Sequence, residues 1–405
     1  MTPTSRRLLG SLGAWVLVLA ALRVSLLAPE ACTPITADEA RAAAVLSAQW
    51  IVDNQASDGE YLYQYLRDDA RAVDDYNLVR HAGTTMSLYQ LVEAGEDRFL
   101  PGADLGLAWM LERSYPTDSG PSAGLAFRDA TSSARLGASA LLLVSMAHRR
   151  AATGDTTHDD TMRAVGRFIA GQQRSDGSML SDWSPRTSKP VEGVTSLYFT
   201  GEALWGLALL HREFPGEGWD ALARPTLDYI ATARDLDEDV FPAPWPDQWA
   251  AYSLQEMGDW GLSDDHIDYA ERIAAQFGTM VRWEAQQTST VATLWLGALL
   301  HGPEPSAAGQ GTWLEGLGML WELSLRDERL GHLQDDLEER LLCSAARLAG
   351  HQVTEARPGE DPTPVVGAWF TDGETRVDHQ QHALSGLLFA ERVLRHTPSG
   401  ETDES

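Results

Sequence analysis

Apolar residues recur at three- and four-residue spacing along most of this chain, which is the spacing of an amphipathic helix. Residues 38–54 and 160–172 are examples, and each has one apolar face and one polar face. Such a helix lies on the outside of a protein with its apolar face inward. The pattern therefore predicts a set of outer helices.

Other segments are apolar or small on most faces, which predicts helices that are buried on most faces. Because they alternate with the outer helices along the chain, we call them inner helices. Five are expected at residues 83–92, 136–148, 201–211, 249–257 and 382–393. One more is expected at either 290–300 or 313–325, since the Gly and Pro residues of 301–305 separate these two segments.

A short motif repeats about every 59 residues. In residues 50–59 and 168–177, an aromatic residue is followed by Ile, then by Gln, then by Asp-Gly, at identical spacings. The aromatic position recurs in this frame at Trp50, Trp109, Phe168 and Tyr229. Five such steps separate Gln55 from Gln352, which gives six units. We predict that the four aromatic residues occupy equivalent positions on successive outer helices and that the Asp-Gly pairs form turns.

Six units of one outer and one inner helix predict an all-α fold, an (α/α)6 toroid of six helical hairpins. It is expected to span residues 32–396, followed by a disordered tail at 397–405. Hairpins with tight turns on one side and long loops on the other place the long loops on one rim. A functional site is expected at that rim.

The first 31 residues read as a targeting segment. Arg6 and Arg7 precede an apolar run from residue 8 to residue 27, which is interrupted only by small residues and Arg23. This pattern is typical of a secretory signal peptide or a membrane anchor, and both alternatives stay open. We expect an exported, periplasmic or otherwise extracytoplasmic protein, which this segment would hold at the inner membrane if it is an anchor.

Charge and cysteine content exclude several kinds of partner. The chain has 59 acidic and 31 basic residues, for a net charge of −28, so it would repel the phosphates of nucleic acids. Cys32 and Cys343 are its only cysteines, too few for a multi-cysteine zinc site. Cys343 is expected to be a buried helical thiol, while lipidation of Cys32 and a bond between the two cysteines stay open. We expect no metal, no cofactor and a monomer.

The motif of residues 50–59 and 168–177 resembles the repeat of the α/α-toroid proteins. That group includes terpenoid cyclases and protein prenyltransferases, and also six-hairpin glycosidases and N-acylglucosamine 2-epimerase-like enzymes. The resemblance covers nearly the whole chain after residue 36 and implies the toroid fold. It implies little about the chemistry, because one fold hosts many functions.

Four segments combine polar residues with the expected start of an inner helix, namely residues 75–83, 198–202, 245–249 and 376–382. Helix N-termini direct backbone N–H groups outward, where hydroxyl and carboxylate groups of a ligand can bind. We therefore predict that these segments converge in a polar cup. Catalytic candidates are Glu202, Asp247, His81, His382 and Tyr198; substrate-binding candidates are Arg80, Tyr76, Asn77, Trp245, Gln248, Trp249, Asp378 and Gln381.

The residue types suggest what each candidate could do. The Arg80 guanidinium can hold a carboxylate, and a histidine such as His81 can move protons near neutral pH. Glu202 is either an acid or base or a partner of its helix dipole. A carboxylate framed by two indoles, as Asp247 is by Trp245 and Trp249, is suited to a sugar. Asp378 and His382 lie four residues apart and share a helical face.

Isoprenoid chemistry is disfavoured. The string from Asp235 to Asp239 is the nearest to the acidic motif of class II terpenoid cyclases, yet it falls in the frame of a turn. Cys343 lacks the neighbouring aspartate of the prenyltransferase zinc site. We expect a carbohydrate-active enzyme of the hydrolase, lyase or epimerase type that acts on a glycan. The alternatives are a non-catalytic glycan- or peptide-binding toroid and a terpenoid-cyclase-like enzyme.

These reactions would use different residues. A glycosidase needs two carboxylates across the scissile bond, for which Glu202 and Asp247 are the expected pair. An epimerase or lyase would instead use His81, His382 or Tyr198 as acid and base, with Arg80 holding a uronate carboxylate.

Overall fold

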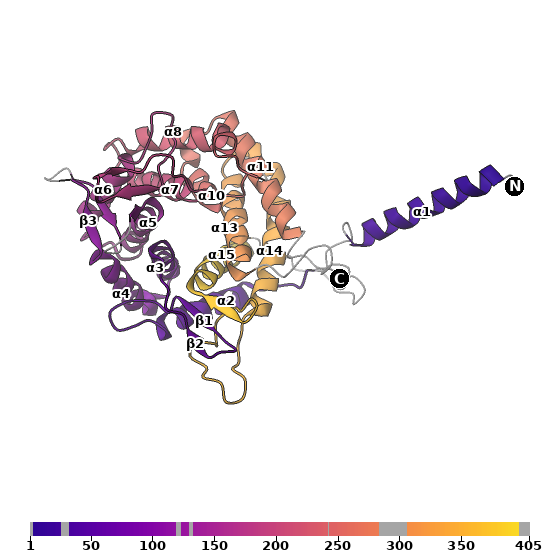
Figure 1. The fold of residues 1–405 in the computed structure, drawn as a ribbon, viewed down its shortest axis with the longest axis horizontal. Coiled ribbons are helices and arrows are strands. Elements are labelled where there is room, and N and C mark those ends of the chain that lie inside the picture. Colours follow the sequence, from indigo (N-terminus) through magenta and orange to yellow (C-terminus); the bar gives the residue numbers. More distant parts are fainter. Residues whose placement is uncertain are drawn as a thin grey trace, which may run out of the picture.

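A computed structural model of the chain describes residues 3–25, 32–118, 123–128, 133–241, 243–282 and 306–396. Most of these residues form a ring of helices in two concentric layers (Figure 1). The outer layer consists of α2 (Ala37–Asp53), α4 (Leu100–Leu111), α6 (Asp159–Ala170), α8 (Trp219–Thr232), α11 (Asp264–Met280) and α14 (Gln334–His351). The inner layer consists of α3 (Leu78–Glu93), α5 (Leu136–Thr153), α7 (Phe199–Glu213), α10 (Gln248–Glu256), α13 (Ala307–Ser324) and α15 (Val377–His396). The predicted toroid of six helical hairpins is confirmed.

The inner helices close into a ring. Each contacts the next in chain order, and α15 packs against both α2 and α3 of the first hairpin. In the fifth hairpin, the inner helix α13 corresponds to the alternative at 313–325. The other alternative, 290–300, lies outside the described residues.

The repeated aromatic residues have one structural role. Trp50, Trp109, Phe168 and Tyr229 all lie in the last turn of their outer helix and are buried. Their burial against the inner layer fixes each outer helix on the ring. The predicted equivalence of the four positions is confirmed.

The repeated glutamine joins neighbouring hairpins. The Nε2 of Gln55 donates to the carbonyl of Gly102 at 3.1 Å, and that of Gln173 donates to Leu222 at 2.8 Å. In both cases the acceptor belongs to the next outer helix. Gln352 donates to Ala43 of α2 at 3.0 Å, so the last repeat is tied to the first.

The Asp-Gly turns make close contact with the next outer helix. The Asp176 carboxylate accepts from the Ser178 backbone N–H at 3.0 Å, which caps the turn. Gly177 has φ = 90°, and a Cβ there would lie 2.1 Å from the carbonyl oxygen of Pro225 in α8. A Cβ at Gly59 would likewise lie 2.3 Å from the carbonyl oxygen of Leu105 in α4. Only glycine combines this conformation with so close an approach.

The long loops all run from an outer to an inner helix, as predicted, and they carry short strands that the sequence did not predict. The strands are β1 (Gln64–Leu66), β2 (Arg71–Ala72), β3 (Ser114–Pro116), β4 (Leu125–Phe127), β5 (Ala134–Arg135), β6 (Asp182–Ser184), β7 (Lys189–Pro190) and β8 (Glu374–Arg376). They pair antiparallel in the orders β2-β1-β8, β3-β4 and β5-β6-β7. Since β1 pairs with β8, the loops of the first and last hairpins are joined across the point where the ring closes.

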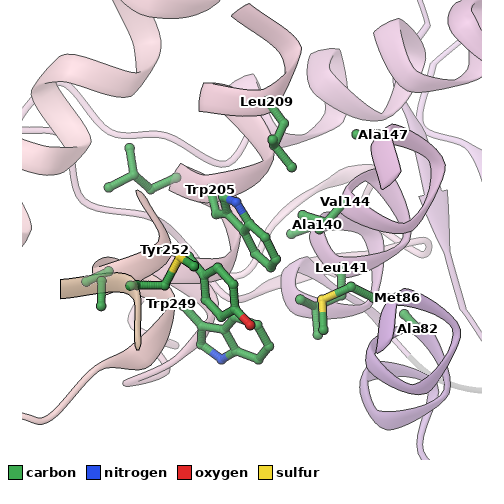
Figure 2. Packing of buried hydrophobic residues seen from close by; sticks show 14 of the residues in the cluster. Ala82, Met86, Ala140, Leu141, Val144, Ala147, Trp205, Leu209, Trp249 and Tyr252 are labelled. Atoms are coloured by element: carbon green, nitrogen blue, oxygen red, sulfur yellow. The ribbon is translucent and has the colours of Figure 1, made fainter. Parts of the chain in front are cut away.

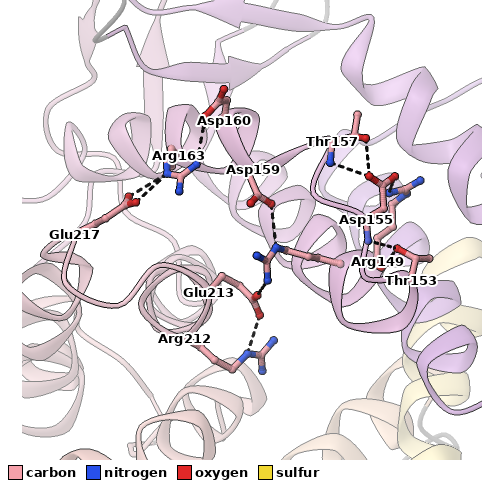
Figure 3. A network of polar contacts seen from close by, with 11 residues as sticks. Arg149, Thr153, Asp155, Thr157, Asp159, Asp160, Arg163, Arg212, Glu213 and Glu217 are labelled. Atoms are coloured by element: carbon pink, nitrogen blue, oxygen red, sulfur yellow. Dashed lines mark hydrogen bonds and ion pairs between the residues drawn. The ribbon is translucent and has the colours of Figure 1, made fainter.

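The opposite rim, where short loops return to the next outer helix, carries many ion pairs. Figure 3 shows one network, in which Arg149 binds Asp155 at 2.7 Å and Arg163 binds Glu217 at 3.0 Å. Arg150 bridges Asp159 and Glu213 in the same way. The two pairs of Arg150 link the second hairpin to the third.

Aromatic side chains fill the centre of the ring (Figure 2). The Trp205 ring stacks on Tyr252 with centroids 4.0 Å apart, and Trp249 lies 5.8 Å from Trp205. Met86 and Leu141 approach them from the other side (Figure 2). These side chains block the central channel of the ring, so a cavity at one rim does not continue through to the other.

The N-terminal helix α1 (Pro3–Ser25) lies apart from the ring (Figure 1) and exposes large apolar side chains such as Trp15 and Leu17. Among the described residues, the length and apolar character required to cross a membrane do not occur together in any helix. Whether the first 31 residues are a signal or an anchor stays a prediction.

Cys32 and Cys343 form a disulfide that ties the segment before α2 to α14. The prediction of a free thiol at Cys343 is therefore wrong, although the residue is buried in a helix as expected. Sequence spacing could not reveal the pair, because 311 residues separate the two cysteines and only the closed ring brings their Cα atoms within 5.0 Å.

Candidate functional site

The first turns of the inner helices surround a cavity of about 360 Å³ on the rim of the long loops. We call it the rim cavity. All six inner helices contribute to it, or the residue directly before them does. Its lining consists of Asn77, Val79, Arg80, Arg135, Leu141, Tyr198, Phe199, Glu202, Gln248, Trp249, Ala308, Gly309, Thr312, Asp378, Gln381 and His382.

Nine of the thirteen residues predicted for the cup line this cavity. They are Asn77, Arg80, Tyr198, Glu202, Gln248, Trp249, Asp378, Gln381 and His382. The other four, Tyr76, His81, Trp245 and Asp247, do not. Three of the four predicted loop-to-helix segments therefore supply the site as expected, and the fourth, 245–249, supplies only its helical end.

Glu202 is a buried carboxyl group at the edge of the cavity. It lies in the first turn of α7 and is 3% exposed, and its Oε2 has no hydrogen-bond partner in the described structure. Its space exists because residue 137, at the start of α5, is glycine: a Cβ there would lie 2.2 Å from Oε2. Burial, together with the nearby Asp247 charge, raises the pKa of Glu202 well above its usual range. A carboxyl group in this state holds a proton that it can donate.

His382 is the histidine of the rim cavity, and a carboxylate holds it. Its Nδ1 lies 2.7 Å from Oε2 of Glu315, a fully buried residue of α13. The Tyr252 hydroxyl donates to the other oxygen of Glu315 at 3.2 Å. A carboxylate at Nδ1 keeps the proton on that nitrogen and leaves the Nε2 lone pair to accept another. The arrangement is that of a general base with its orienting partner.

Arg80 and Asp378 form an ion pair in the wall of the cavity, with Nε and Oδ2 3.1 Å apart. Arg376 also binds Asp378 at 3.2 Å, and the Arg80 guanidinium contacts the Tyr63 hydroxyl. Burial alone would raise the pKa of Asp378, but the adjacent Arg80 charge outweighs it and holds the pKa below its usual value. Asp378 is therefore ionised. Because Arg376 also lies 3.8 Å from the Glu374 carboxylate, two carboxylates compensate the two guanidinium groups.

Apolar ring faces and polar amides complete the wall. Trp249 lies at the start of α10 with its ring centroid 5.9 Å from that of His382, and Tyr198 before α7 is 39% exposed. The side chain of Asn77 caps α3 by accepting from the Val79 N–H at 2.9 Å, so its amide oxygen serves the helix. Gln248 and Gln381 offer amides to the cavity.

The prediction that His81 belongs to the cup is wrong. Its Nδ1 lies 2.7 Å from the Tyr76 hydroxyl and its Nε2 2.9 Å from the carbonyl of Gly106, so both ring nitrogens are engaged. The ring stacks on Trp109 and is 1% exposed. Burial lowers the pKa of His81 to about 3, which keeps it neutral. His81 and Tyr76 together hold the first two hairpins against each other.

Asp247 is likewise placed outside the cavity, which contradicts its predicted position beside the sugar. Its Oδ1 accepts from the backbone of Trp249 at 3.0 Å and caps α10, while its Oδ2 lies 2.5 Å from the fully buried Arg234. Arg234 in turn donates to the Tyr269 hydroxyl. The indole of Trp245 packs edge-on against Tyr198, behind the cavity wall. The sequence pattern showed a carboxylate between two indoles, but it could not show that this carboxylate is bound by the buried Arg234.

Two charged residues of the site were not predicted from the sequence. Glu315 lies in the middle of an apolar helix, where a buried glutamate is itself a signal of a buried partner. Arg135 directly precedes α5 and lines the cavity, and its loop was not among the four segments considered. The string from Asp235 to Asp239 contributes nothing to the cavity. The sequence frame indicates a turn there, but the first three residues of the string belong to the short helix α9 (Arg234–Asp237), and only Glu238 and Asp239 form a turn.

A second cavity of about 350 Å³ lies at the other end of the ring. It is lined by residues from the last turns of the inner helices, including Glu93, Glu256 and Glu322. Each of these carboxylates is paired within the ring, to His148, Arg212 and Arg392 respectively. Within the described residues, no three His, Cys, Asp or Glu side chains are arranged so that they could hold a metal ion.

Comparison with known proteins identifies the fold. No family model and no curated protein sequence matches the chain. Among solved structures, an unsaturated glucuronyl hydrolase specific for heparin has a TM-score of 0.60 at 11% identity, over 88% of this chain and 98% of that one. D-mannose isomerase has a TM-score of 0.60 at 12% identity, over 88% and 97%. A glycoside hydrolase family 76 mannosidase from Bacteroides thetaiotaomicron has a TM-score of 0.57 at 14% identity, over 89% and 98%. These proteins are six-hairpin α/α-toroid enzymes, and the chain has the fold that they share.

Proposed function

We propose that this protein is a carbohydrate-active enzyme that moves protons on a sugar bound in the rim cavity, as an epimerase or isomerase does. The observation that carries the proposal is the pairing of His382 with the buried Glu315 in the same cavity as the protonated Glu202. The similarity of the whole fold to sugar hydrolases, epimerases and isomerases supports the choice of a sugar as substrate.

The two groups stand on opposite sides of the ring. Glu202 belongs to α7 and His382 to α15, the third and sixth of the six inner helices. A sugar between them presents one face to each. His382 Nε2 removes a proton from the carbon beside the carbonyl of the open-chain sugar, which leaves an enediolate. Glu202 delivers its proton to the other face of that carbon, and both groups then exchange protons with water. The configuration of the carbon is thereby inverted.

The remaining lining residues suit a sugar. The exposed Tyr198 ring can stack on the C–H face of a pyranose, the buried Trp249 contributes apolar wall, and Gln248 and Gln381 can bind hydroxyl groups. A volume of about 360 Å³ accommodates a mono- or disaccharide rather than a long glycan.

Glycoside hydrolysis is the second candidate, and a specific observation favours it. Glu202 is protonated and Asp378 is ionised in one cavity, which are the states of a general acid and its partner carboxylate. The pair proposed from sequence, Glu202 with Asp247, is replaced here by Glu202 with Asp378. The ion pairs of Asp378 with Arg80 and Arg376 reduce its basicity, so this candidate ranks second.

We further propose that the enzyme works outside the cytoplasm. The disulfide between Cys32 and Cys343 is typical of an oxidising compartment. The exposed apolar side chains of α1 are consistent with a targeting segment, as the sequence suggests.

Incubation with a panel of aldoses and ketoses in D2O tests the function. Proton transfer at carbon incorporates solvent deuterium beside the carbonyl, and NMR detects the label and the new epimer. The wild type and the control His332→Asn, an exposed histidine outside the cavity, should label a sugar. His382→Asn should lower the rate by roughly 10²-fold or more. Release of new reducing ends from oligosaccharides without label would select the hydrolase. Binding of sugars without either reaction would contradict an enzyme and leave a glycan-binding protein.

A further inference from the structure

Arg135 is a charged residue of the rim cavity whose guanidinium has no hydrogen-bond or ion-pair partner in the described part of the chain. It directly precedes α5 and is exposed in the cavity wall. Among the described residues, no carboxylate or carbonyl binds its side chain. Its cross-strand neighbour Asp182 is the nearest acid by register, but that carboxylate accepts from Ser133 at 3.1 Å. In a chain with 59 acidic residues, a cavity-facing arginine without a carboxylate needs an explanation.

The other charged groups of the cavity each have a direct partner. Arg80 is paired with Asp378, and the Glu315 carboxylate is held by His382 and by the Tyr252 hydroxyl. Glu202 carries no charge while it is protonated. Among the described lining residues, the Arg135 guanidinium is therefore the charged group without a direct partner, and it is positive although the protein as a whole carries −28.

The electrostatic potential also differs between the two ends of the ring and is more positive at the rim cavity. Inner helices direct their N-terminal ends toward the rim cavity and their C-terminal ends toward the opposite cavity. The helix dipoles add positive potential at the first and negative potential at the second. At the opposite cavity, moreover, Arg212 and Arg392 are both neutralised by glutamates. The rim cavity is thus the end of the molecule suited to an anion.

We propose that the substrate of the rim cavity is an anionic sugar, a uronate or another sugar acid, whose carboxylate binds Arg135. This inference rests on the proposed function and specifies its substrate class. A guanidinium binds a carboxylate through two parallel N–H···O bonds, which fixes the orientation of the sugar as well as its charge. Gly137, two residues further along, touches Glu202, so the carboxylate end of the sugar lies on the side of the general acid.

The distant negative charges do not prevent this binding. At an ionic strength of 0.15 M the Debye length is about 8 Å, so charges on the outer helices are largely screened at the cavity. A direct pair with Arg135 is screened far less. Binding of a carboxylate therefore depends on the direct pair with Arg135 more than on the net charge of the protein.

Calorimetry with matched sugars tests the proposal. The probes are the methyl glycosides of glucuronate, galacturonate and mannuronate and those of glucose, galactose and mannose. We expect the wild type to bind at least one uronate more tightly than its neutral counterpart by roughly tenfold or more, the gain from a charge-assisted hydrogen bond. Arg135→Gln should abolish that preference while changing the affinity for the neutral sugar by less than about twofold. Arg186 is an exposed arginine of the β6–β7 turn outside the cavity. Arg186→Gln removes one positive charge as well, but it should leave the preference for the uronate unchanged.

The outcomes separate this inference from the proposed function. Equal affinity for uronates and neutral sugars, or a preference that survives Arg135→Gln, would overturn the inference and leave the sugar site intact. Failure to bind any sugar of either set would contradict the proposed function as well. Because Arg135 is exposed, Arg135→Gln is expected to fold, and Arg135→Lys should retain part of the preference by retaining the charge.

Discussion

Glu202 is kept protonated by its surroundings, and this has consequences for stability as well as activity. An unfolded glutamate has a pKa of about 4.3, whereas burial beside Asp247 raises the pKa of Glu202 in the folded protein. Its contribution to stability is therefore complete below the ordinary pKa and is lost as the pH rises through the raised one. Activity that needs the protonated acid should decline on the same alkaline side.

Glu202→Gln tests this directly. The amide cannot donate as an acid, so turnover should fall by roughly 10²-fold or more at all pH values. The amide also cannot ionise, so the melting temperature should equal or exceed that of the wild type at pH 7 to 8 and should depend less on pH. Turnover and melting are measured between pH 5 and 9. Unfolding of the variant at neutral pH would show that Glu202 is a structural partner instead.

Asp247 should behave in the opposite way, because it neutralises the fully buried Arg234. Asp247→Asn leaves that charge unpaired and should lower the free energy of unfolding by about 3–5 kcal/mol. Asp237→Asn, which changes an exposed carboxylate ten residues earlier, is the matched control and should change the free energy of unfolding by less than about 0.5 kcal/mol. Equal effects in urea titrations would contradict the structural role of Asp247.

The sequence predicted residues of the site where polar side chains begin an inner helix, as for Arg80, Glu202 and His382. It could not distinguish a residue that faces the cavity from its neighbour that faces another helix. His81 follows Arg80 by one residue, about 100° around the helix, and so contacts Tyr76 and Gly106 instead. Glu315 was missed because its partner His382 lies 67 residues away in sequence.

Among the elements, the Asp-Gly turns that follow the outer helices are the part of the repeat that joins neighbouring hairpins. Gly177 and Gly216 both have positive φ, 90° and 88°, but only a Cβ at 177 would meet backbone, the Pro225 carbonyl at 2.1 Å. Gly216→Ala should therefore lower the free energy of unfolding by about 1 kcal/mol, because alanine is strained at this positive φ. At Gly177 it should cost about 3 kcal/mol or more, because α8 must move as well.

The comparison of the two alanine variants by thermal or urea unfolding isolates the contact from the backbone strain. If Gly177→Ala were no more destabilising than Gly216→Ala, the Asp-Gly turn would be an ordinary turn and would not join neighbouring hairpins.

Helices were the predictable elements and strands were not. The 3.6-residue pattern extends over long segments, whereas β1 to β8 contain two or three residues each, too few for an alternating pattern. Inner helices also begin earlier than predicted. α3 starts at Leu78 rather than 83, and α15 starts at Val377 rather than 382. Their first turns are polar because they face the cavity, and that polarity hid the helix from an apolar pattern.

At the scale of the molecule, the disulfide holds the ends of the ring domain together. It connects residues 311 positions apart, and closure of so long a loop in the unfolded chain is expected to contribute up to about 5 kcal/mol. Cys343→Ser should lower the melting temperature under oxidising conditions, and dithiothreitol should lower that of the wild type to the same value. The variant itself should not respond to dithiothreitol. A wild type that is insensitive to reductant would contradict a structural role for the bond.

The ring offers a ligand two cavities of similar size on one axis, separated by the stacked rings of Trp205, Trp249 and Tyr252. We propose that the chemistry takes place in the rim cavity, and a crystal structure with a bound sugar or sugar acid is the decisive measurement. We expect a sugar in the rim cavity, within hydrogen-bond distance of His382 Nε2 and in contact with Glu202. A sugar in the opposite cavity alone would contradict it.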